Sequence, residues 1–217
     1  MLSLKFVVIL GASLAQKAAA RTFTVYNACP FTIWPAMFTD LNVAPNVPAY
    51  QTGWEAAAYT AVSFSVPDNW KAGRIWGVPP ATVAEWTLQG DGNQDFYDVS
   101  LVDGYNLPMS ITNNKGCHVA NCAVDLGPNC PDPLKGPFDS TGFPVGCKSA
   151  CSANLDGNPG MNSYLVSFRA DNQSVSHSYF KGNCPNSYAY AYDESSGTAI
   201  WTCDSGLNAD YTLTFCP

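Results

Sequence analysis

Short segments of alternating apolar and polar residues recur along most of the chain and predict β-strands. Aromatic and β-branched side chains occupy every second position in them, which is the period of a strand with one buried face. Glycine, proline, asparagine and aspartate fill the gaps between these segments, and no extended window has the period of a helix. The predicted strands are residues 22–26, 31–34, 61–66, 73–77, 82–88, 96–102, 107–112 and 211–215.

Regular short strands separated by turns predict an all-β fold, an antiparallel β-sandwich or barrel. The pattern changes at about residues 130–184, where proline, glycine and cysteine are frequent and only short helical patterns occur, at 148–155 and 176–181. We interpret this stretch as a loop-rich, disulfide-stapled subdomain. Alternation returns at 188–192 and in the last predicted strand, so we expect the first and last strands to pair.

The first 20 residues have the organisation of a secretory signal peptide. Residues 1–5 carry a positive charge on Lys5, and residues 6–15 form a short apolar run. Ala18 and Ala20 supply the small residues that precede a cleavage site. The run is too short for a spanning helix, which needs about 20 residues. We therefore expect a secreted protein of residues 21–217, located outside the cell or in the cell wall, with no membrane span.

The cysteines are expected to form disulfides, because a secreted chain places them in an oxidising compartment. Their odd number leaves one unpaired, and the sequence alone does not choose the pairing. The two matched CxxC halves of a zinc site are absent, and residues 91–102 lack the glycine and glutamate of a calcium loop, so no metal or cofactor is expected. The nine cysteines are residues 29, 117, 122, 130, 147, 151, 184, 203 and 216.

Net charge narrows the possible partners. The formal charge is −7, and it becomes −9 when Lys5 and Lys17 leave with the signal peptide. A surface of this sign offers no basic footprint for nucleic acid or anionic membranes. A neutral polysaccharide or a cationic partner suits it better.

Three carboxylates stand out from the acidic residues of the turns. Glu85 lies in the middle of a predicted strand, on the face of Val83 and Thr87, where it either faces water or belongs to a site. Asp98 lies in another strand and Asp103 five residues later, so the two meet only if the strand bulges or Asp103 has entered the turn. Two carboxylates beside one glycosidic oxygen are the minimal machinery of glycoside hydrolysis.

Six segments resemble the thaumatin-like proteins, and they are distributed in order over nearly the whole chain after residue 20. The segments are FTVYNACPFTIWPA at 23–36, GRIWG at 73–77, TVAEWTL at 82–88, DFYDVSLVDGYNLPM at 95–109, GCKSAC at 146–151 and DYTLTFCP at 210–217. The resemblance implies a β-sandwich carrying a disulfide-rich subdomain, with an acidic cleft between them.

The family's cleft is lined by one arginine, one glutamate and three aspartates. Carried over residue by residue, they fall on Arg74, Glu85, Asp98, Asp103 and Asp193, although Glu194 offers a second acid beside the last. In members with weak endo-β-1,3-glucanase activity, the residues matching Glu85 and Asp103 are the acid and the nucleophile or base. Arg74, Asp98 and Asp193 would then bind substrate.

The resemblance also implies a disulfide framework. It pairs Cys29 with Cys216, Cys117 with Cys203, Cys122 with Cys184 and Cys130 with Cys147, and it leaves Cys151 as a free thiol. The chain departs from larger members, which carry a small cysteine-rich hairpin subdomain between the GRIWG and AEW segments. Here only residues 78–81 remain, so the preferred substrate length cannot be carried over.

The resulting expectation is a monomeric, secreted protein that binds β-1,3-glucan or a related cell-wall polysaccharide and has weak endo-β-1,3-glucanase activity. The alternative is a non-catalytic module of the antifungal, defence or enzyme-inhibitor type that uses the same cleft. Asn172 starts the NQS sequon and is a candidate glycosylation site.

Overall fold

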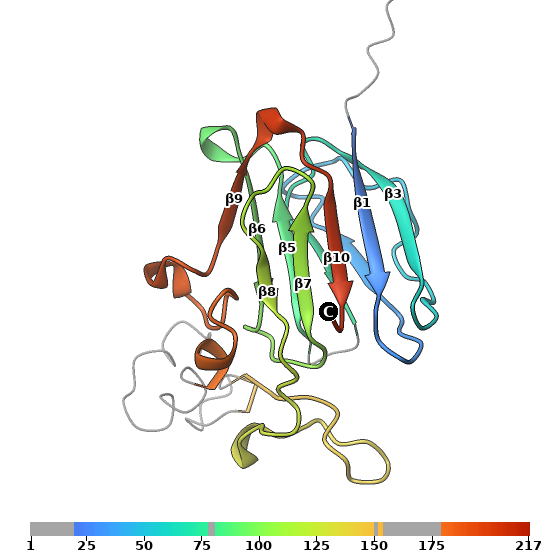
Figure 1. The fold of residues 1–217 in the computed structure, drawn as a ribbon, viewed down its shortest axis with the longest axis vertical. Coiled ribbons are helices and arrows are strands. Elements are labelled where there is room, and N and C mark those ends of the chain that lie inside the picture. The colour runs from blue at the N-terminus through green and yellow to red at the C-terminus, as the bar shows by residue number, and fades with distance from the viewer. Residues whose placement is uncertain (1–19, 78–80, 150–151, 154–178) are drawn as a thin grey trace, which may run out of the picture.

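Two five-stranded sheets pack face to face, as the computed structural model shows for residues 20–77, 81–149, 152–153 and 179–217 (Figure 1). The first sheet has the strand order β3-β1-β10-β7-β8 and the second has the order β2-β4-β5-β6-β9. The predicted all-β sandwich is therefore confirmed. The predicted signal peptide lies outside the described residues, except that Ala20 begins β1.

The strands of the described part are short, as the turn spacing predicts. Their bounds are β1 Ala20–Asn27, β2 Ala36–Thr39, β3 Ala61–Pro67, β4 Gly73–Trp76, β5 Val83–Thr87, β6 Gln94–Ser100, β7 Met109–Asn113, β8 Ala120–Cys122, β9 Trp201–Asp204 and β10 Tyr211–Phe215. Single 3-10 turns occur at η1 Asp91–Asn93, η2 Asp132–Leu134, η4 Asp193–Ser196 and η5 Ser205–Leu207.

The first and last strands pair, as expected, but they do so in parallel. Phe23 of β1 lies opposite Tyr211 of β10, whereas every other strand pair of the described residues is antiparallel. The chain returns from the subdomain and inserts β10 between β1 and β7. The two ends of the domain therefore lie side by side in the middle of the first sheet (Figure 1).

Two predicted strands are wrong. In residues 31–34 only Ile33 pairs, through an isolated bridge to Ala56, and the strand β2 begins after Pro35, which has no N–H to donate to a ladder. In residues 188–192 only Tyr188 forms a bridge, and Tyr192 has a φ of 68° that ends any extended run. Strands β8 and β9 were not predicted because three or four residues are too few to reveal a period.

Aromatic residues fill the space between the sheets. The ring of Phe23 on β1 contacts Trp70, Trp86 and Tyr211 at centroid distances of 5.6, 5.2 and 5.3 Å. All four side chains are buried. Packing of this kind joins a strand of one sheet to a strand of the other and supplies the main stabilising term of the fold.

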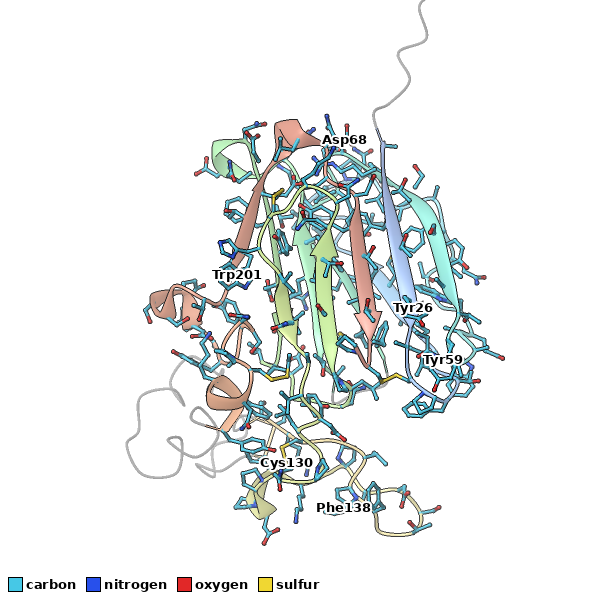
Figure 2. The ribbon with its side chains drawn as sticks, viewed as in Figure 1. Tyr26, Tyr59, Asp68, Cys130, Phe138 and Trp201 are labelled. Carbon is cyan, nitrogen blue, oxygen red and sulfur yellow. A yellow bond between two sulfur atoms is a disulfide. The ribbon has the colours of Figure 1, made fainter. Side chains whose placement is uncertain are left out.

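A buried ion pair also links the two sheets. Arg21 at the start of β1 contacts the carboxylate of Asp95 on β6. That carboxylate also accepts hydrogen bonds from the Tyr211 hydroxyl at 2.9 Å, the Ser205 hydroxyl at 2.7 Å and the Gln89 N–H at 3.1 Å. Arg21 also pairs with Asp68, labelled at the top of the sandwich in Figure 2, at 3.4 Å. Asp95 is thereby fully engaged in the fold.

The four disulfides implied by the resemblance are all present in the described residues. They join Cys29 to Cys216, Cys117 to Cys203, Cys122 to Cys184 and Cys130 to Cys147. The first fastens the loop after β1 to the end of β10. Cys151, the predicted free thiol, and Asn172, the predicted glycosylation site, lie outside the described residues.

The chain after β8 runs below the sandwich, where Cys130 and Phe138 lie in Figure 2. Residues 179–183 form a short helix that overlaps the predicted helical pattern at 176–181, while residues 152–153 form a turn. Over the described residues, no helix has the length and apolar character needed to cross a membrane. The extent of the subdomain, about residues 130–184, stays a prediction.

Candidate functional site

Three of the five predicted site residues form a row across the second sheet. Glu85 on β5 lies directly opposite Arg74 on β4 and directly opposite Asp98 on β6. Directly opposed residues share a face and have Cβ atoms about 4.5–5.5 Å apart. Two antiparallel pairings in matching register therefore bring one cation and two carboxylates together from three segments of the chain.

The alternation of each strand turns this row away from the core. Ile75, Ala84 and Val99, which neighbour the three site residues along their strands, are fully buried between the sheets. Their neighbours must then point to the outer face, since successive side chains of a strand alternate. The expectation that Glu85 lies opposite to the core face of its strand is confirmed.

Arg74 and Glu85 form an ion pair on this outer face. The Nε atom of Arg74 lies 2.7 Å from Oε1 of Glu85, and their side chains are 51% and 28% exposed. The Ser100 side chain also acts on Glu85 and lowers its pKa. Glu85 is therefore held in place by Arg74 while part of its side chain stays open to a ligand.

Asp103 lies in the turn that follows β6, three residues after the strand ends. The turn after Ser100 is closed by a hydrogen bond of 3.0 Å from the Gly104 N–H to the Leu101 carbonyl, and Gly104 has a φ of 107°, which favours glycine. Asp103 has thus entered the turn, one of the two ways in which it can meet the strand carboxylates. Its charge raises the pKa of Glu85.

The fifth predicted residue, Asp193, is buried and engaged in the fold. Lys181 lies 2.8 Å from its Oδ2 atom, which also accepts a hydrogen bond from the Ala189 N–H at 2.9 Å. The next residue, Glu194, is exposed, accepts a hydrogen bond from the Tyr188 hydroxyl at 2.7 Å, and raises the pKa of Asp98 by its charge. Of the two adjacent acids, Glu194 is the one whose charge acts on the row.

Burial dominates the electrostatics of the two strand carboxylates. Removal from water raises the pKa of Glu85, and the Arg74 guanidinium opposes this rise only in part. The pKa of Asp98 is raised further above its ordinary value, by burial and by the charge of Glu85. The Oδ1 atom of Asp98 is buried and has no hydrogen-bond partner among the described residues.

This arrangement can act on a neutral polar ligand in two ways. The Arg74 guanidinium donates hydrogen bonds and the carboxylates accept them, which suits a molecule rich in hydroxyl groups. A carboxyl group with a raised pKa also holds a proton at mildly acidic pH and can donate it as a general acid. Sequence reasoning missed Ser100 and Tyr188, because both act through partners on other elements.

Comparisons with known proteins identify the family of the chain. The model of the Thaumatin family matches residues 27–78 and 77–217. Thaumatin-like protein 2 of Prunus persica is 34% identical over 92% of this chain and 92% of its own length, and a glucan endo-1,3-beta-glucosidase of Prunus avium is 33% identical with the same coverage. A solved structure, the protein elicitor MoHrip2 from Magnaporthe oryzae, covers 91% of this chain and 100% of its own, with 11% identity and a TM-score of 0.47. On the family match and the two Prunus relatives, the chain belongs to the thaumatin family.

Proposed function

We propose that this protein is secreted, binds β-1,3-glucan of cell walls at the Arg74-Glu85-Asp98 row, and hydrolyses internal linkages slowly. Glu85 is the proton donor and Asp103 the base or nucleophile. Arg74 and Asp98 hydrogen-bond sugar hydroxyls beside them. Asp193 contributes indirectly, by fixing the turn that presents Glu194.

The observation that carries the proposal is the state of Glu85. Its pKa is raised by burial and by the nearby Asp103 charge, yet its side chain is not closed off from solvent. A general acid must hold a proton and must be accessible to its substrate; the raised pKa of Glu85 favours the first condition and its partial exposure favours the second. Asp103, exposed in the turn, is the available second acidic residue.

Further support comes from charge and from a relative. The acidic chain suits an uncharged glycan. One relative of similar length bears the name glucan endo-1,3-beta-glucosidase. Four disulfides in the described residues fit an oxidising compartment, as a secreted protein requires.

The test is reducing-end release and product sizing on a soluble β-1,3-glucan at mildly acidic pH. Glu85→Gln removes the proton donor at nearly constant shape, so release should fall by about 10²-fold or more. Glu55→Gln is the matched control, because Glu55 is an exposed glutamate in a loop outside the row. It should keep wild-type activity.

Other outcomes separate the parts of the proposal. If the wild type releases no sugar but is retained on insoluble glucan, the protein is a non-catalytic binding module and the roles of Glu85 and Asp103 are withdrawn. If Glu85→Gln releases sugar as fast as the wild type, Glu85 is not the proton donor. If the wild type neither binds nor cuts β-1,3-glucan, the proposed substrate is wrong.

A further inference from the structure

An exposed aromatic side chain extends the row of site residues at its other end. Phe38 on β2 lies directly opposite Arg74, so the row across the sheet reads Phe38, Arg74, Glu85 and Asp98. The neighbouring pair, Met37 and its partner on β4, is buried in the core, which places Phe38 on the outer face. Phe38 is 51% exposed.

A second aromatic ring lies next to it on the same face. Trp76 is two residues along β4 from Arg74 and opposite Ala36, whose side chain is a single methyl group. Trp76 is only partly buried, in contrast to Trp54, Trp70 and Trp86, which belong to the core. Phe38 and Trp76 are diagonal neighbours on adjacent strands, a separation that aromatic side chains can bridge.

We propose that Phe38 and Trp76 form a stacking platform for one sugar ring of the glucan, at the Arg74 end of the row. This inference rests on the proposed function and specifies how the substrate lies. A pyranose ring has an apolar face of C–H groups, which pack on an aromatic ring and leave water, and a rim of hydroxyls. The aromatic platform packs against the apolar face of the sugar, and Arg74 donates hydrogen bonds to the hydroxyl groups at its rim.

The spacing of the strands sets the direction of the bound chain. Phe38 and Asp98 are separated by three inter-strand distances of about 4.7–4.9 Å, or about 14 Å in all. A glucan that uses both ends of the row therefore runs across the strands. The stacked sugar lies beyond Arg74, and the reacting bond lies at Glu85, so the platform contributes to binding and touches no reacting atom.

Two experiments measure binding. One is a calorimetric titration with β-1,3-gluco-oligosaccharides, and the other is retardation of the protein in gels containing soluble β-1,3-glucan. Phe38→Ala should weaken binding about fivefold or more, equivalent to about 1 kcal/mol. Phe38→Tyr keeps the ring and should bind within about twofold of wild type. Phe31→Ala is the matched control, because Phe31 is 50% exposed but lies outside the strands of the second sheet.

The outcomes distinguish this inference from the proposed function. Wild-type binding with no loss in Phe38→Ala overturns the platform and leaves the glucan site standing. Equal losses in Phe38→Ala and Phe31→Ala also overturn it, because the effect would then not depend on the sheet face. Absence of binding by the wild type overturns both. Thermal unfolding of each variant, expected to match wild type closely, shows that the losses are not due to misfolding.

Discussion

The Cys29–Cys216 disulfide allows a direct test of how the chain ends stabilise the sandwich. It joins residues 187 apart, and a bridge of this span stabilises mainly by restricting the unfolded chain. The Cys117–Cys203 bridge offers a shorter path through the unfolded chain, from Cys29 to Cys117 and from Cys203 to Cys216. The effective loop is therefore about 100 residues, which corresponds to about 4.7 kcal/mol.

A second disulfide of the same chain supplies the control. Cys130–Cys147 closes a separation of only 17 residues, which the same relation values at about 3 kcal/mol. Cys29, Cys130 and Cys147 are buried and Cys216 is partly buried against the core, so replacing the Cys29–Cys216 pair by alanine removes no more packing than replacing the Cys130–Cys147 pair. The Cys29→Ala/Cys216→Ala variant should thus lose about 1.5 kcal/mol more stability than the Cys130→Ala/Cys147→Ala variant.

The assay is equilibrium unfolding in urea under non-reducing conditions, followed by tryptophan fluorescence and evaluated as the free energy of unfolding. A loss of either size is large against the 5–15 kcal/mol typical of a folded domain. The reasoning is refuted if the two variants lose the same stability, or if the short-loop variant loses more. Either result would mean that local native contacts, and not the span of the loop, determine the contribution of the bridge.

Three further predictions concern buried charge and close packing. The raised pKa of Asp98 means that the folded state binds the Asp98 proton more tightly than the unfolded state does, so wild-type stability should fall as pH rises above about 4. Asp98→Asn should lack this fall and should be more stable than wild type at pH 7 by about 1.4 kcal/mol for each unit by which the Asp98 pKa is raised. If the free energies of unfolding in urea change with pH in the same way for both proteins between pH 4 and 7, the prediction is wrong. Arg21→Met leaves Asp95 as an uncompensated buried charge and should lower the free energy of unfolding in urea by about 3–5 kcal/mol. Adding Asp95→Asn to Arg21→Met should restore part of this loss. A loss below about 1 kcal/mol in Arg21→Met alone would show that the ion pair is not needed. Gly73→Ala would place a Cβ 2.3 Å from the buried Trp70 ring and should lower stability by about 1–3 kcal/mol. In the control Gly182→Ala, the new Cβ meets nothing within 4 Å, so stability should not fall. Equal melting temperatures for the two variants would refute the clash.

Much of the fold was accessible from local sequence pattern. The strand period is a property of the extended backbone, so it correctly placed Trp86 in the core and Glu85 on the opposite face. It failed at residues 31–34, where Pro35 delays the strand, and at residues 188–192, where Tyr192 adopts a left-handed conformation. In both cases one residue's backbone overrides a pattern of side chains.

The disulfide pairing came from the family resemblance, because spacing alone leaves many pairings open. Glu85, Asp98 and Asp103 stood out from the strand pattern, whereas Arg74 and Asp193 came from the resemblance. The four pairings were correct in the described residues. The roles of Glu85 and Asp103 stay proposals. For the acid at the 193–194 turn, adjacent positions in sequence have opposite environments, since Asp193 is buried against Lys181 and Glu194 is exposed.

The sequence by itself determined the fold class and the face on which each strand residue lies, since these depend on interactions between near neighbours in the chain. Only the tertiary structure decided which strands are adjacent and in what register. Register places Phe38, Arg74, Glu85 and Asp98 in one row, although they span 60 residues of sequence. It also decided the direction in which the pKa values of Glu85 and Asp98 shift, because burial and the charges of distant segments raise both.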